Sequence, residues 1–178
     1  MPDNLKVWTT VGSAGTLNQA DLAKVTLHQS IIQLGAELSN TGGAAAAPVP
    51  GGVLQNTIQA VVRYNVTPVD GLFLPGPFKY QLQVRFRNHI TAKLMEVDLA
   101  TGAEKQLLLL DSQSFPPNPN FQVQSVAPKK DSTVMDFVNK AYYVEATLIA
   151  SALVVGHPAE ISIIKVISSS DFTDVGSR

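Results

Sequence analysis

The chain has 178 residues, a net charge of −1 and a hydrophobic fraction of 45%, so it is long and apolar enough to bury one ordinary core. Its basic residues are scattered along the sequence, which argues against the basic patch of a nucleic-acid-binding protein. Cysteine is absent, which excludes disulfides, thiolate catalysis and cysteine-ligated metal centres.

The N-terminal part of the chain predicts short elements. Residues 9–18 contain two glycines and several hydroxyl side chains, which favour a loop, and Asn18 is placed to cap one helical turn over 19–24. Residues 25–34 are rich in β-branched and aliphatic side chains and predict a strand that ends at Gly35.

Residues 40–52, NTGGAAAAPVPGG, have the lowest complexity in the chain and contain no charge. Such a composition buries little surface, so it predicts a flexible loop within one domain spanning 1–178. A domain linker is the alternative, but the segment before it is too short to be a domain. We expect the polar tail from residue 171 to fray.

The remainder of the chain predicts strands separated by turns rich in glycine and proline. Gly102 marks a hairpin turn over 100–103, since glycine reaches positive φ without steric cost. The predicted strands are 54–66, 79–87, 91–99, 104–110, 121–126, 141–151 and 160–168.

This pattern of about eight strands, with no helix longer than two turns, predicts an all-β protein built as an antiparallel two-sheet sandwich. The long proline-rich connections favour a jelly-roll-like or other Greek-key order, because they suit crossings between two sheets. An up-and-down β-barrel is the alternative.

The most regular strand is 79–87, KYQLQVRFR, in which polar and apolar residues alternate without a break. Its apolar side predicts a core face, and its polar side carries Gln81, Gln83, Arg85 and Arg87. Long amide and guanidinium side chains on a flat sheet can bind a carbohydrate or an acidic partner, although a solvated surface explains them as well. Trp8 and Tyr143 are aromatic residues from which a sugar platform could be built.

No motif for catalysis or cofactor binding is present, so we predict no catalytic residue and no cofactor, and an enzyme is the less favoured class. Glu96 and Asp98 lie two apart on one predicted strand and are weak candidates for a metal site, although exposed strand carboxylates usually only meet solvent. The three histidines, His28, His89 and His157, are far apart and predict structural or solvated roles.

Two strands are apolar on both sides: Leu107 to Leu110, and 161–167, where Ile161 and Ile163 share one side and Ile164 and Val166 the other. Such strands are covered on both faces, either by a loop or by another subunit.

We therefore expect a non-enzymatic interaction or structural module that forms a homo-oligomer, with a possible carbohydrate or protein partner and without nucleic-acid or membrane binding. A carbohydrate- or small-ligand-binding module is the alternative, and a hydrolase with a non-motif site is the second alternative.

The longest nearly uncharged apolar run, 146–155, is too short to span a bilayer, and the first residues lack the pattern of a signal peptide. We expect a soluble protein, cytoplasmic by default.

Overall fold

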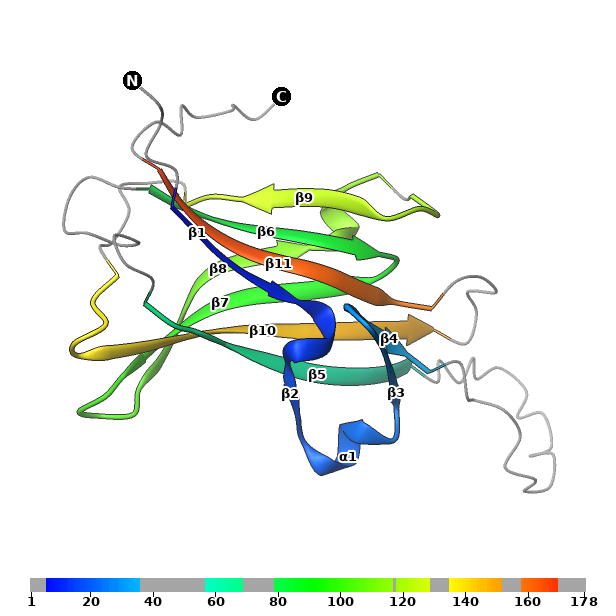
Figure 1. Cartoon of the computed structure of the whole chain (residues 1–178), viewed down its shortest axis with the longest axis horizontal. Helices are drawn as coiled ribbons and strands as arrows, with labels where there is room; N and C mark the ends of the chain where they lie inside the picture. Colours follow the sequence, from blue (N-terminus) through cyan, green and yellow to red (C-terminus); the bar gives the residue numbers. More distant parts are fainter. Residues whose placement is uncertain are drawn as a thin grey trace, which may run out of the picture.

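The computed structural model describes residues 6–35, 57–68, 79–116, 118–128, 135–151 and 158–169. These residues form two antiparallel sheets packed face to face (Figure 1). Sheet A contains β1 (Lys6–Val11), β3 (Val25–His28), β4 (Ile31–Leu34), β6 (Lys79–Arg87), β9 (Gln122–Val126) and β11 (Glu160–Ser169). Sheet B contains β2 (Thr16–Leu17), β5 (Thr57–Val66), β7 (Ile90–Asp98), β8 (Glu104–Asp111) and β10 (Lys140–Ser151). The predicted two-sheet sandwich is confirmed, and the barrel alternative is wrong because the two sheets do not close into one.

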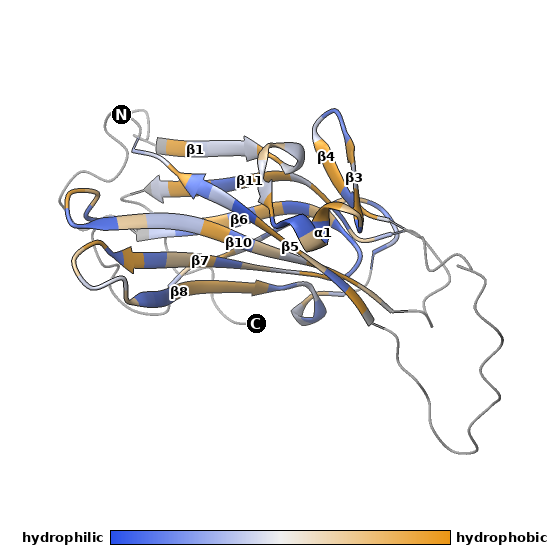
Figure 2. Cartoon of the chain, turned by 90° about the horizontal axis from the view of Figure 1, so that it is seen from below, coloured by the Kyte–Doolittle hydropathy of each residue, from blue (hydrophilic) through white to orange (hydrophobic). Residues whose placement is uncertain are grey.

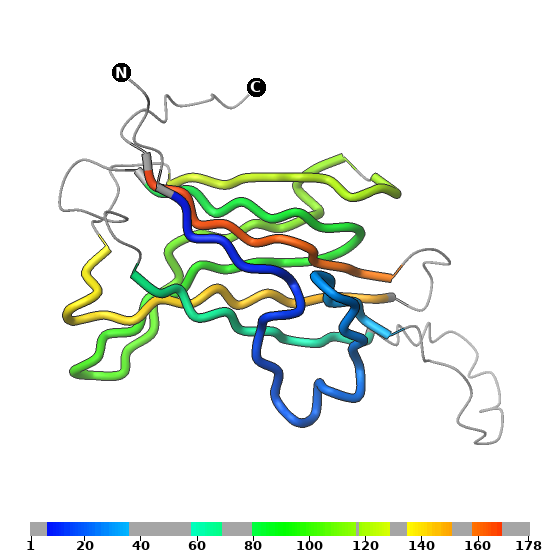
Figure 3. Tube along the Cα trace, in the orientation of Figure 1, coloured from blue at the N-terminus to red at the C-terminus, as the bar shows by residue number. Residues whose placement is uncertain are grey.

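The order of the long strands is interleaved. Strands β1, β11, β6 and β9 lie side by side in sheet A, and β5, β10, β7 and β8 lie side by side in sheet B. From β5 onward the chain changes sheet at every connection except the β7–β8 hairpin, a path that can be followed in Figure 3. This is the arrangement of a jelly roll, in which eight strands form two sheets through Greek-key connections.

The described residues contain eleven strands where about eight are predicted, and the difference lies mainly near the N-terminus. The loop predicted over 9–18 is partly wrong, because Thr9 to Val11 belong to β1 and pair with β11. The single strand predicted over 25–34 is two strands, β3 and β4, joined by a turn in which Gln29 has a φ of 45°.

The one-turn helix α1 (Gln19–Leu22) confirms the predicted cap. The side chain of Asn18 accepts a hydrogen bond from the backbone nitrogen of Asp21 at 2.8 Å. The described residues include no helix that is long and apolar enough to cross a membrane.

The core lies between the sheets and follows the alternation read from the sequence. The apolar side chains of β6, namely Tyr80, Leu82, Val84 and Phe86, are at most 4% exposed. Figure 2 shows the corresponding change between apolar and polar colour along the strands. Strand β6 has the predicted bounds, Lys79 to Arg87.

A β-bulge changes how β11 presents its side chains. The register against β6 shifts between Ile161 and Ile163, so Ile161, Ile164 and Val166 are all fully buried, while Ile163 lies opposite Arg85 on the outer face. The prediction that Ile161 and Ile163 share one side of the strand is therefore wrong, because Ile161 lies on the core side with Ile164 and Val166.

Strand β8 also differs from its prediction. Leu108 and Leu110 are buried in the core, but Leu109 is 43% exposed on the outer face of sheet B. The described part of the chain therefore leaves the outer side of this leucine run uncovered.

Candidate functional site

The predicted polar row of β6 lies on the outer face of sheet A. Gln81, Gln83, Arg85 and Arg87 point to the same side and are half-buried. The Nε2 atom of Gln83 donates to the Oγ of Ser125 on β9 at 3.1 Å. The structure thus confirms that the four side chains share a face, and shows that cross-strand contacts hold part of the row in place.

Arg87 makes the strongest of these contacts. Its Nε atom donates to Oε2 of Glu160 at 3.0 Å and its Nη2 atom donates to Oε1 at 2.7 Å. The two residues face each other across β6 and β11, and their side chains are 21% and 6% exposed. This bidentate geometry fixes both side chains, and the hydrogen-bonding groups of the Arg87 guanidinium that it occupies are not free to bind a ligand.

Phe121 supplies an aromatic ring to the same surface. The Cζ atom of Arg85 lies 4.4 Å from the centre of this ring and that of Arg87 lies 5.2 Å from it, both within the range of a cation–π interaction. Sequence reasoning missed Phe121, because its contact with β6 depends on the pairing of β6 with β9. We call this surface, formed by Gln81, Gln83, Arg85, Arg87, Phe121, Val123, Ile163 and Lys165, the outer face of sheet A.

Two cations on the outer face of sheet A have no carboxylate partner within ion-pair distance among the described residues. Arg85 donates from Nη1 to the Oγ of Ser162 at 2.9 Å, and Lys165 lies opposite Gln83 on β11. This part of the surface is therefore positively charged.

The two predicted aromatic platform residues lie elsewhere. Trp8, on β1, is 7% exposed and belongs to the core between the sheets. Tyr143, on β10, is 8% exposed, and its ring lies 5.2 Å from the Cζ atom of Arg63 on sheet B. The structure does not bring either residue to the polar row of β6.

The outer face of sheet B carries paired charges. Glu145 lies between Arg63 and Lys93, with nitrogen-to-oxygen distances of 3.0 Å and 3.4 Å. The hydrogen bond to Glu145 is the main cause that raises the pKa of Arg63. Positive and negative side chains therefore alternate across the strands of sheet B. On sheet A, by contrast, Arg85 and Lys165 have no carboxylate partner among the described residues.

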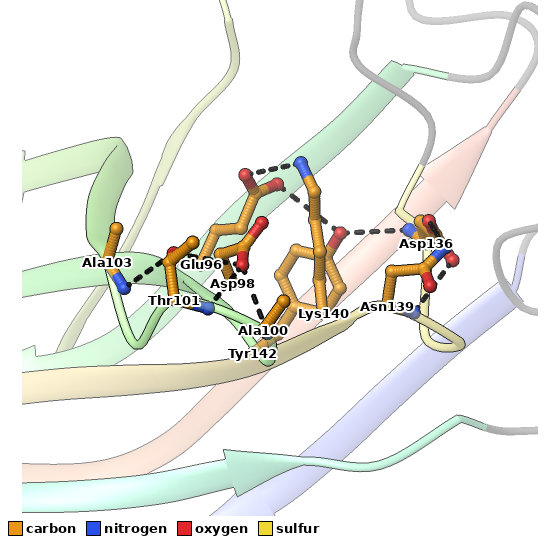
Figure 4. A network of polar contacts seen from close by, with 9 residues as sticks. All are labelled: Glu96, Asp98, Ala100, Thr101, Ala103, Asp136, Asn139, Lys140 and Tyr142. Atoms are coloured by element: carbon orange, nitrogen blue, oxygen red, sulfur yellow. Dashed lines mark hydrogen bonds and ion pairs between the residues drawn. The ribbon is translucent and has the colours of Figure 1, made fainter.

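Glu96 and Asp98, the predicted carboxylate pair, have separate partners in a polar network at one end of the sandwich (Figure 4). Glu96 is 6% exposed and accepts hydrogen bonds from the Nζ atom of Lys140 at 2.6 Å and from the hydroxyl of Tyr142 at 3.3 Å. The hydrogen bond to Glu96 raises the pKa of Lys140, and burial raises the pKa of Tyr142 to about 12.

Asp98 holds the turn of the β7–β8 hairpin. Its Oδ1 atom accepts hydrogen bonds from the backbone nitrogens of Ala100 and Thr101 and from the hydroxyl of Thr101 at 2.9–3.1 Å. The contacts from Thr101 are the main cause that lowers the pKa of this carboxyl. In the part of the chain that the structure describes, no group of three or more histidines or carboxylates is placed to hold a metal ion.

The histidines remain apart. His28 is exposed on β3, and His89 lies half-buried between β6 and β7, where its carbonyl accepts a hydrogen bond from the backbone of Ile149 at 3.0 Å. His157, the predicted loop 40–52 and the predicted tail from 171 lie outside the described residues.

Comparison with known protein families finds no matching family model, and comparison with curated proteins finds no match.

Proposed function

We propose that this protein is a non-enzymatic structural module that associates with copies of itself. The observation that supports this proposal is the inverted polarity of residues 122–124 of β9. Its pairing with β6 places Gln122 and Gln124 on the side of Phe86 and Val84, toward the interior of the sandwich. Val123 takes the outer side and is 52% exposed.

A sheet with one side in water normally directs polar side chains outward and apolar ones inward, as β6 does. At Gln122, Val123 and Gln124 strand β9 does the reverse, whereas Ser125 faces outward and Val126 faces the core. Phe121 and Ile163 lie half-buried on the same outer face, with Arg85 between Val123 and Ile163, so Val123 is one of several apolar side chains on this surface rather than a lone exposed residue. Covering this surface with another protein surface removes apolar area from water and favours association.

Oligomer formation is tested by measuring the molar mass in solution by light scattering over a range of micromolar concentrations. We expect a mass above that of the monomer that rises with concentration, and a lower mass for Val123→Ser. The matched control is Leu99→Ser, since Leu99 is 60% exposed in the β7–β8 turn, on sheet B. A wild-type protein that stays monomeric throughout contradicts the proposed function.

A second candidate function, the binding of an acidic carbohydrate, rests on the outer face of sheet A. Arg85 stacks against Phe121, and Lys165 and Gln83 lie beside each other on neighbouring strands. An aromatic ring beside amides and unpaired cations suits a sugar that carries carboxylate or sulfate groups.

Titration calorimetry with a sulfated oligosaccharide tests this second function. We expect binding that weakens about tenfold in Lys165→Gln, a loss of about 1.4 kcal/mol. Lys105→Gln is the control, because Lys105 is exposed on β8 in sheet B. Absence of binding, or an equal loss in both variants, rejects the carbohydrate function.

A further inference from the structure

Strand β9 forms one border of sheet A. It pairs with β6 on one side, and among the described residues no strand pairs with its other side (Figure 1). A border strand carries a row of backbone N–H and C=O groups that are available for pairing with another chain.

The sequence of β9 and its flanking residues lacks the devices that protect such a border. Residues 121–127, FQVQSVA, contain no charge, no proline and no glycine. Natural border strands usually carry lysine, proline or a bulge, or are covered by another segment. Proline lies outside this stretch, at Pro119 before the strand begins and at Pro128 after it has ended.

Both borders of sheet B are protected in these ways or by further pairing. Strand β8 carries Glu104, Lys105 and Asp111, and a register shift interrupts its pairing with β7. The side of β5 away from β10 pairs with β2 and is also covered by α1 and Lys24, because Asp21 accepts a hydrogen bond from the backbone nitrogen of Val61 at 3.2 Å and Lys24 donates to the carbonyl of Gln59 at 3.1 Å.

We propose that β9 pairs antiparallel with β9 of a second copy across a two-fold axis, which joins the two A sheets into one continuous sheet. This inference rests on the proposed self-association and names its surface and geometry. In the register we propose, Val123 lies opposite its own copy and Gln122 lies opposite Gln124.

The chemistry of β9 suits an identical partner. A two-fold axis places a residue near its own copy, so any charge at the axis would meet a like charge. In the proposed register Val123 instead lies opposite Val123 of the second copy, so two apolar side chains meet on the outer face. Each glutamine amide is both donor and acceptor, so Gln122 and Gln124 can bond to each other across the interface.

The absence of cysteine from the chain allows a direct test by cross-linking. Single cysteines are introduced as Gln122→Cys, Val123→Cys, Gln124→Cys and Ser125→Cys, and the oxidised proteins are examined for covalent dimers. Directly opposed residues of antiparallel strands have Cα atoms about 4.5–5.5 Å apart, within the range of a disulfide. We expect a covalent dimer for Val123→Cys and none for the control Leu109→Cys on β8.

A charge at the axis gives the second test. We expect Val123→Lys to raise the dimer dissociation constant at least about tenfold, because two lysines then lie opposite each other. Leu109→Lys is the control, since Leu109 is 43% exposed on a border strand of sheet B and Val123 is 52% exposed. Circular dichroism establishes that each variant is folded.

The outcomes separate this inference from the proposed function. A monomeric wild-type protein rejects both. A wild-type oligomer that persists in Val123→Lys, together with no covalent dimer at any of the four cysteine positions, rejects β9 pairing and leaves self-association intact.

Discussion

The Arg87–Glu160 pair predicts a measurable stabilisation of sheet A. Arg87 belongs to the polar row that the sequence offers as a binding surface, yet both of its hydrogen bonds to Glu160 lie within the sheet. The proposed perturbation is a double-mutant cycle with Arg87→Met, Glu160→Gln and the combined variant, which isolates the interaction between the two side chains.

The size of the effect follows from burial. Exposed ion pairs contribute about 0.2–1 kcal/mol, whereas removing one partner of a buried pair costs about 3–5 kcal/mol. Arg87 is 21% exposed and Glu160 is 6% exposed, so this pair lies between the two cases. We expect Arg87→Met to cost about 2–3 kcal/mol, because it leaves a buried carboxylate without its partner, and the interaction energy to be about 1.5 kcal/mol.

Urea unfolding of the four proteins at neutral pH measures these values by linear extrapolation. For a chain of this size a loss of 2–3 kcal/mol lowers Tm by about 4–12 °C. The control is Arg63→Met, since Arg63 is 55% exposed in its pair with Glu145, and it should cost less than about 1 kcal/mol. An interaction energy below about 0.5 kcal/mol, or equal losses in Arg87→Met and Arg63→Met, would refute the reasoning.

Two further predictions concern the N-terminal segment and the glycines. Asp21→Ala should cost about 2 kcal/mol at neutral pH, because it leaves the backbone nitrogen of Val61 without its partner. Lys24 is the main cause that lowers the pKa of Asp21 in the folded protein, so this stabilisation is present above the ordinary pKa of 3.8 and is lost as the pH falls through the folded-state pKa. Urea unfolding at neutral and acid pH checks the prediction. It is contradicted if the difference in unfolding free energy between the wild type and Asp21→Ala is the same at both pH values. Gly12→Ala should destabilise by about 3 kcal/mol or more, since the added Cβ would lie 2.0 Å from the carbonyl oxygen of Ile161. Gly102→Ala meets no neighbouring atom and should cost only about 1–2 kcal/mol for its φ of +72°. Equal losses of stability in the two glycine variants would show that the contact with Ile161 does not determine the cost of Gly12→Ala.

Local patterns in the sequence were sufficient for several elements. The alternation over 79–87 gave the bounds of β6, and Gly102 gave the hairpin turn between β7 and β8. Asn18 gave the start of α1. Each of these features depends on residues within a few positions of one another, so the sequence contains the physical cause.

The residues that contact the polar row of β6 could not be predicted from the sequence in the same way. Arg87 and Glu160 are 73 residues apart, and Phe121 reaches Arg85 only because β9 pairs with β6. The bulge at Ile161 to Ile163 likewise arises from pairing with β6 and is not visible as a break in the apolar run. These features depend on register, which is set by contacts between distant segments.

The sequence by itself therefore determined that the chain is a two-sheet β-protein, because side-chain alternation is a local property of each strand. Only the tertiary structure decided which strands form the borders, that Trp8 lies in the core and that β9 presents Val123 outward. The physical reason is that the order and register of strands minimise the free energy of all pairings together, and no single segment contains that information.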